Sequence, residues 1–339
     1  MFRSLCFLFV PAVLLAASPA LPQTGSSLDQ EVRRIGHQTA EWLVYSVSSE
    51  SAGRFICCHT WSGGTLRPVT CRPEDDHGSW VVSGKRQTIG SRALLQVYLG
   101  VENGKVRRVQ TYSAGCDVET SWPVHELHNV SQVESLALLR RLALETDRKQ
   151  RPDRDEVLGA LVEHRTEETV VVLGELTESS MEADLREKAL FWLGQTRRPT
   201  AVELLSERLT DEPSGKLRQH ILFCLSQTDR PEAAKRIRRA AEQDVSAEVR
   251  EQGWFWLAQT GDPSAEDAIF RALRDEPDRR VREHAVFALS QLPGGRSVDA
   301  LLRVLRTSDD RDVTRQALFW LAESRDPRAL ERISELLDS

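Results

Sequence analysis

The chain has 339 residues and a formal net charge of −6, and this length exceeds what one hydrophobic core normally supports, so we expect more than one domain. Charged residues make up 28% and hydrophobic residues 40% of the sequence, which is typical of a folded protein and argues against disorder. The acidic balance lacks the basic excess of nucleic-acid-binding proteins, so we expect no nucleic acid among the partners.

Residues 1–20 have the pattern of a secretory signal peptide. A positive start at Arg3 precedes an apolar run over residues 5–17, and Ser18-Pro19-Ala20 supplies small residues for cleavage. The apolar run is too short for a stable membrane span, and a short anchor that stays uncleaved is the alternative. No later apolar stretch is long enough to cross a membrane. We therefore expect a periplasmic or secreted protein with no membrane span after signal cleavage.

Residues 26–130 predict a small α+β domain. The strongest local signal is a hairpin in which Leu94–Val101 and Val106–Ser113 flank Asn103-Gly104, because Asn-Gly suits the type I′ turn between antiparallel strands. Two further segments are rich in β-branched and aromatic residues and predict strands, and a short helix precedes them. These are the strands Trp42–Val47 and Arg54–Trp61 and the helix Leu28–Thr39.

Four cysteines lie in this first domain: Cys57, Cys58, Cys71 and Cys116. An oxidising compartment favours disulfides among them. The first two are adjacent on a predicted strand, so their side chains point to opposite faces and do not pair with each other. Two arrangements stay open, Cys57–Cys71 with Cys58–Cys116, or Cys57–Cys116 with Cys58–Cys71. A metal or redox site that adds His59 and His77 is the alternative, but the spacing matches no zinc pattern, so we expect no metal.

From residue 131 onward the chain predicts repeated pairs of helices. Five segments fall into register at a shift of 32 residues, without insertion or deletion. In each, the first, fifth, eighth and ninth residues form an apolar stripe at helical spacing, and a turn and a second amphipathic helix follow. The segments begin at Leu185, Leu217, Val249, Val281 and Val313, and the turns are marked by Pro199, Pro231, Pro263, Gly295 and Pro327. A degenerate copy begins at residue 153, and Glu134–Leu144 begins or caps the array.

These segments, such as LREKALFWLGQ from Leu185 and VREHAVFALSQ from Val281, resemble bacterial HEAT repeats, including the HEAT-like repeats of phycobilin lyases. The resemblance covers more than half of the chain, over residues 153–339. It implies an all-α, HEAT-like solenoid, expected over residues 131–339, of the kind that usually serves as a binding surface. It does not imply bilin attachment, because no residue matches a chromophore site, and we expect no cofactor.

One column of the repeat holds Arg186, Arg218, Arg250 and Arg282, and Thr314 ends the series. In similar repeats this arginine commonly pairs with an acidic residue of the adjacent repeat. Suitable carboxylates lie one loop away, at Glu212, Asp244 and Glu276. We interpret the column as structural, because Arg–carboxylate forks commonly tie elements together. An anion-binding ladder is the alternative.

A second column repeats one aromatic residue, at Phe191, Phe223, Phe255, Phe287 and Phe319. At about 100° per residue this position lies far from the apolar stripe, so stacked repeats would set the rings in a row on an open face. A row of exposed rings would indicate a binding surface; burial of each ring between neighbouring repeats is the alternative. The stripe itself includes Trp192, Trp256 and Trp320, interpreted as packing residues, and Cys224, interpreted as a buried thiol.

No nucleophile elbow, zinc-protease motif or phosphate-binding loop occurs in the sequence, so we identify no catalytic residues. Together, these features predict an exported HEAT-repeat binding or scaffold protein that engages a protein or peptide partner in the cell envelope. A lyase-like enzyme that uses the solenoid as a substrate cradle and a structural spacer are the alternatives.

Overall fold

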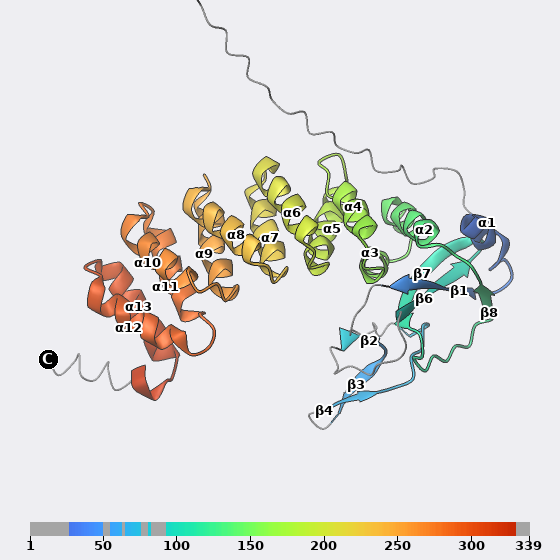
Figure 1. Ribbon diagram of the computed structural model, residues 1–339, viewed down its shortest axis with the longest axis horizontal. Coiled ribbons are helices and arrows are strands. Elements are labelled where there is room, and N and C mark those ends of the chain that lie inside the picture. The colour runs from blue at the N-terminus through green and yellow to red at the C-terminus, as the bar shows by residue number, and fades with distance from the viewer. Residues whose placement is uncertain (1–26, 50–54, 63–64, 76–80, 83–92, 330–339) are drawn as a thin grey trace, which may run out of the picture.

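The computed structural model describes residues 27–49, 55–62, 65–75, 81–82 and 93–329, and it consists of a small sheet region followed by a long row of helices (Figure 1). The predicted signal peptide and His77 lie outside the described residues. Within the described ranges, no helix has the length and apolar content needed to cross a membrane.

The main sheet has four strands in the order β7-β6-β1-β8. β6 and β7 form the predicted hairpin, with Asn103 and Gly104 at φ of 52° and 67°, as a type I′ turn requires. β1 pairs antiparallel with β6 and parallel with β8. The sequence pattern does not anticipate β8, because this strand contains a single β-branched residue. The strands are β1 (Glu41–Ser49), β6 (Ala93–Glu102), β7 (Lys105–Ser113) and β8 (Val124–Leu127).

The two faces of this sheet belong to different apolar cores, because successive side chains of a strand point to opposite faces. On β1, Leu43 and Tyr45 pack in the core that continues into the helices. Trp42 and Val44 pack on the other face, with the cysteine-bearing segments. The first core is covered by α1 (Ser27–Arg34), which is shorter than predicted, and by α2 (Gln132–Leu144).

Two disulfides stabilise the second face. Cys57 is bonded to Cys116 and Cys58 to Cys71, so the structure selects the second of the two arrangements that the sequence leaves open. The single strand predicted over Arg54–Trp61 is wrong. The two cysteines interrupt it, because each bonds a different partner, and they separate β2 (Phe55–Ile56) from β3 (His59–Ser62). These pair with β5 (Val81–Val82) and β4 (Thr65–Pro68), respectively.

Buried contacts join the sheet region directly to the helices. Glu156 on α3 (Arg154–Glu163) accepts a hydrogen bond of 3.0 Å from the N–H of Val109 on the edge strand β7. The hydroxyl of Ser49 donates to the carbonyl of Glu163 at 2.8 Å. A covered edge strand cannot pair with another chain. The sheet region therefore closes the N-terminal end of the row, as the end of a stacked array requires.

The helices from α3 to α13 form two layers, in which odd-numbered helices contact one another along one row and even-numbered helices form the other (Figure 1). The degenerate copy is α3 with α4 (Glu167–Leu176). The odd-numbered helices that follow are α5 (Ala183–Gln195), α7 (Gly215–Ser226), α9 (Ala247–Gln259), α11 (Arg279–Ser290) and α13 (Arg311–Glu323). The even-numbered ones are α6 (Pro199–Asp211), α8 (Pro231–Gln243), α10 (Ala265–Asp275) and α12 (Arg296–Thr307).

Local sequence explains where these helices begin. Side chains of Ser214 and Ser246 accept hydrogen bonds from first-turn N–H groups of α7 and α9, and such caps satisfy donors that have no intrahelical partner. Pro199 and Pro231 are the first residues of α6 and α8, so they belong to helices and not to the predicted turns. The fixed φ of proline suits the first helical position, where its missing N–H costs nothing.

Candidate functional site

Aromatic rings on the odd-numbered helices form one continuous row, here called the aromatic ladder. Neighbouring ring centroids lie between 4.7 and 6.1 Å apart, within the range in which aromatic pairs attract each other. The structure thus brings the five predicted phenylalanines into one row with three tryptophans. In order, the ladder consists of Trp192, Phe191, Phe223, Trp256, Phe255, Phe287, Trp320 and Phe319.

The tryptophans of the ladder do more than fill the core of their own repeat. Trp256 lies 5.0 Å from Phe223 of the preceding repeat, measured between ring centroids. The equivalent position is small in the repeats between tryptophans, where it holds Cys224 or Ala288. Large and small side chains therefore alternate along this column of the repeat. The tryptophans recur every 64 residues (256 − 192 = 64). This spacing is the signal in the sequence from which their place in the ladder could have been predicted.

The ladder begins where the phenylalanine column is interrupted. The equivalent position in the degenerate copy is Gly159 (191 − 32 = 159). A Cβ atom at Gly159 would lie 3.3 Å from the indole of Trp192, so this ring covers the place of the missing phenylalanine. Its Nε1 donates a hydrogen bond of 3.2 Å to Asp155 on α3. The first ring is thereby held on the degenerate copy.

The exposure of the ladder lies between the two alternatives that the sequence leaves open. Phe191, Phe223, Phe255 and Phe287 are partly buried, whereas Phe319 at the C-terminal end is 52% exposed. Each of the four is covered in part by a ring of an adjacent repeat. The ladder is therefore a half-buried aromatic face.

Polar side chains lie along the ladder. His220 lies 6.0 Å from Phe223 between ring centroids, and its Nε2 donates to the carbonyl of Glu187 at 3.0 Å. His284 has the same place two repeats later, 6.1 Å from Phe287, with its Nε2 3.7 Å from a carboxylate oxygen of the buried Glu251. Both imidazoles thus lie against the preceding repeat, and the side chain of His284 stays 44% exposed.

The arginine column is structural, as predicted. Arg218 donates to both carboxylate oxygens of Asp244 at 2.8 Å, and Arg250 donates to both oxygens of Glu276 at 3.0 Å. Further pairs are Arg154 with Glu182 and Asp184, Arg186 with Glu212, and Arg282 with Asp310. Each arginine joins its odd-numbered helix to the loop before the next one. Because these guanidinium groups are already paired within the fold, they do not form an anion-binding ladder.

A buried polar chain at the junction with the sheet region has no counterpart in the sequence analysis. Tyr45 lies 2.7 Å from the hydroxyl of Ser135, which lies 2.8 Å from Nε2 of His164. Burial lowers the pKa of His164 to about 4, so its ring is neutral at pH 7. The order resembles a serine nucleophile with its base, but Ser135 and His164 are 0% exposed. Both side chains are therefore closed to a substrate. The hydrogen-bonded series of Tyr45, Ser135 and His164 instead joins the sheet region to the helices.

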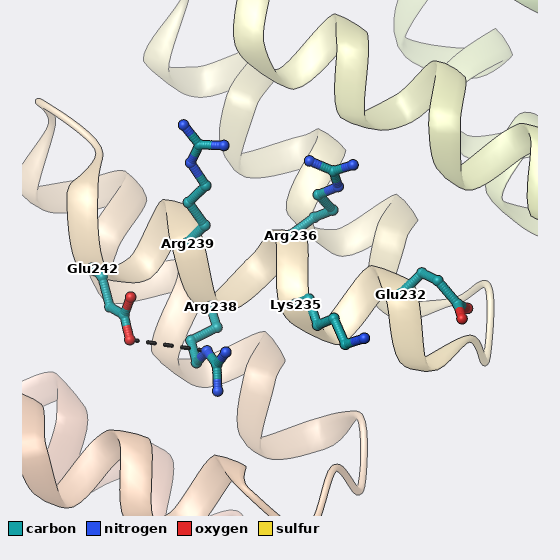
Figure 2. A pocket seen from close by; sticks show the side chains of 6 residues that line it. All are labelled: Glu232, Lys235, Arg236, Arg238, Arg239 and Glu242. Atoms are coloured by element: carbon teal, nitrogen blue, oxygen red, sulfur yellow. Dashed lines mark ion pairs between the residues drawn. The ribbon is translucent and has the colours of Figure 1, made fainter.

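The opposite layer has a basic surface on α8. Figure 2 shows Lys235, Arg236, Arg238 and Arg239 along this helix, between Glu232 and Glu242, around a shallow hollow. Arg238 forms an ion pair of 3.9 Å with Glu242. The hollow has no apolar side chain and no buried polar group, so it lacks the features of a small-molecule site. Among the described residues, no group of three or more His, Cys, Asp or Glu side chains is arranged to hold a metal ion.

Comparisons with known proteins identify the repeats. The family of HEAT repeats matches residues 170–254 and 240–322, and the PBS lyase HEAT-like repeat matches residues 313–339. No match was found among curated proteins.

Solved structures that are similar to parts of the chain include a hydroxylase and a lyase complex. Human deoxyhypusine hydroxylase in complex with glycerol is 17% identical, over 56% of this chain and 89% of that one, with a TM-score of 0.27. The complex of CpcE and CpcF of phycocyanin lyase from Nostoc is 20% identical, over 59% and 79%, with a TM-score of 0.34. The repeat pattern and the family matches together show that residues 170–339 of this chain belong to the HEAT-like repeats.

Proposed function

We propose that this protein is an exported HEAT-repeat binding protein whose aromatic ladder takes up a protein or peptide partner in the cell envelope. The observation that carries the proposal is the ladder itself, a continuous row of partly accessible rings on one layer of the solenoid. Aromatic side chains supply much of the binding energy at protein interfaces. A folded protein seldom keeps so many accessible rings in one row without a use for them.

Export is supported by the cysteine chemistry. Two disulfides stabilise the sheet region, and such bonds persist in oxidising compartments outside the cytoplasm. The pattern of residues 1–20 fits a cleaved signal peptide. Cell fractionation with N-terminal sequencing tests this part of the proposal. We expect the protein in the periplasm or medium, starting close after Ala20; an intact N-terminus on cytoplasmic protein would contradict it.

Binding on the ladder is tested by comparing two sets of phenylalanine variants. The double variant Phe255→Ala/Phe287→Ala removes a stacked pair whose centroids lie 5.6 Å apart. Phe270→Ala is the matched control, because Phe270 lies on α10 in the other layer, where Arg303 covers its ring at 4.0 Å. Purified variants are used to capture partners from an envelope extract after circular dichroism confirms their helical content. We expect the double variant to lose partners that wild type and the control retain. Equal capture by wild type, the double variant and the control would show that the ladder is not part of the binding surface.

The match of residues 313–339 to the PBS lyase HEAT-like repeat favours a second candidate, a lyase-like enzyme that uses the solenoid as a substrate cradle. A chromophore that copurifies with the protein, detected by visible absorbance, would support this candidate. A structural spacer would present a polar face along the row, and the aromatic ladder argues against it.

A further inference from the structure

The aromatic ladder repeats with a period of two HEAT repeats. Phe191 and Phe223 stack with centroids 6.1 Å apart and planes inclined by 17°. Phe255 and Phe287, each 64 residues later (255 − 191 = 287 − 223 = 64), stack at 5.6 Å and 4°. The phenylalanines of different pairs, Phe223 and Phe255, meet through the intervening Trp256. The five phenylalanines thus form two stacked pairs and one terminal ring.

A tryptophan bounds each stacked pair on both sides. Trp192 precedes the first pair, and Trp320 follows the second. Trp256 stands between the pairs, 5.0 Å from Phe223 and 4.7 Å from Phe255. The second pair meets Trp320 at 4.8 Å and 43°, which closely repeats the 5.0 Å and 47° between Phe223 and Trp256. The two pairs therefore have the same surroundings.

Polar groups follow the same period. The imidazoles of His220 and His284 lie beside the second phenylalanine of each pair. Glutamine stands four residues after each of the first four phenylalanines, but the bond to a preceding serine follows the two-repeat period: the side-chain amide nitrogens of Gln227 and Gln291 donate to Ser226 and Ser290 at 3.1 and 3.0 Å. These bonds orient both side chains, whose Oε1 atoms accept no hydrogen bond from the described residues. Each stacked pair is thus accompanied by one imidazole and one hydrogen-bond acceptor.

We infer that the ladder consists of two equivalent subsites, and that its partner is an extended polypeptide segment with two apolar anchor residues about four or five positions apart. This inference rests on the proposed function. The equivalent rings Phe223 and Phe287 are joined through Trp256 and Phe255 by centroid distances of 5.0, 4.7 and 5.6 Å, so subsites two repeats apart are separated by at most about 15 Å. An extended chain advances about 3.3 Å per residue and covers this distance in about four or five residues. A helix advances about 1.5 Å per residue and would need about ten.

The hydrogen-bonding groups favour the extended form. Main-chain N–H groups in a helix are already bonded to carbonyls four residues earlier. An extended segment leaves these donors free, so they can bond to the unpartnered oxygens of Gln227 and Gln291. Two linked anchors also bind more tightly than one, because the second binding event is intramolecular. The face therefore selects partners by the spacing of their apolar residues as well as by their hydrophobicity.

The test uses fluorescein-labelled synthetic peptides with two phenylalanines separated by two to fourteen positions of Gly and Ser, and a single-phenylalanine peptide of matched length. Binding to the full mature chain is followed by fluorescence anisotropy. We expect the tightest binding near a spacing of four or five, at least about tenfold tighter than for the single-anchor peptide. Affinity that does not depend on spacing would overturn the two-subsite inference. An optimum near about ten would overturn the extended form in favour of a helical partner.

Variants of one subsite at a time complete the test. Phe223→Leu and Phe287→Leu keep apolar volume and remove one stacked pair each, and Phe270→Leu is the control in the other layer. We expect each ladder variant to reduce the affinity of the tightest-binding two-anchor peptide to the single-anchor level, with little effect on the single-anchor peptide. A loss confined to one variant would show that the subsites are not equivalent. Absence of binding by every peptide to wild type, together with unchanged partner capture by Phe255→Ala/Phe287→Ala, would refute the proposed function itself.

Discussion

Arg218 has the most complete set of hydrogen bonds in the arginine column, and its removal tests how the repeats are held together. Its guanidinium group donates to both oxygens of Asp244 at 2.8 Å and to the carbonyls of Glu212 and Pro213 at 3.1 and 3.0 Å. The side chains of Arg218 and Asp244 are each 10% exposed. Arg218→Ala leaves a mostly buried carboxylate without its counter-charge, a change that typically costs about 3–5 kcal/mol. We expect a loss of this size in the free energy of unfolding.

The matched control is Arg282→Ala, in the same column two repeats later. Arg282 donates to one oxygen of Asp310 at 3.2 Å, and the Asp310 side chain is 31% exposed. When Arg282 is removed, water can solvate the carboxylate of Asp310 in its place. We therefore expect this ion pair to contribute about 1 kcal/mol or less to the free energy of unfolding. The last repeat holds Thr314 at this position, whose hydroxyl bonds to the carbonyl of Asp310 at 2.9 Å, which shows that a repeat at the end of the row forms without the arginine.

Denaturant unfolding followed by tryptophan fluorescence measures both variants. Because stacked repeats can unfold in parts, amide hydrogen exchange on α7 and α9 should accompany it and locate the loss. Equal effects of the two substitutions, or a change below about 1 kcal/mol for Arg218→Ala, would refute the reasoning that burial determines the strength of these pairs.

Three further predictions concern packing, pH and thiols. Gly253→Ala should destabilise the protein by about 1–3 kcal/mol although alanine favours helices, because its Cβ would lie 2.7 Å from that of Ala241; Gly215→Ala, whose nearest neighbour would be 3.7 Å away, is the denaturation control. Stability should fall as pH drops from 6.5 toward 4, because burial holds the pKa of His164 near 4 in the folded state while the unfolded chain binds the proton at about 6.5. Chemical denaturation at several pH values measures this, and a His164→Gln variant with the same pH profile as wild type would contradict it. Iodoacetamide should label the mature protein only after denaturation and only at Cys224, the buried free thiol, and mass spectrometry that finds label on the other cysteines without reductant would argue against the disulfides.

Sequence and structure agree most closely where a pattern is local or repeated. The 32-residue register predicts the first helix of every pair, because five copies of the same apolar spacing leave little freedom in where the helices lie. The arginine column and its carboxylates share that register, and the resemblance to other HEAT repeats implied the pairing that the structure contains. The hairpin around Asn103-Gly104 could also be predicted from sequence, because a two-residue turn determines the pairing of its strands.

The disulfide arrangement and the character of the aromatic face were decided by tertiary structure. Cys57 and Cys116 are 59 residues apart in the sequence, and only the folded sheet region brings them together in preference to the other arrangement. A helical wheel places Phe223 outside the core of its own repeat. The wheel does not include Trp256, which comes from the next repeat and partly covers that ring. The sequence by itself therefore determined the repeat, the column of rings and the pairing of the arginines. How far each ring is buried depends on contacts between repeats, because those contacts arise only when the helix pairs stack.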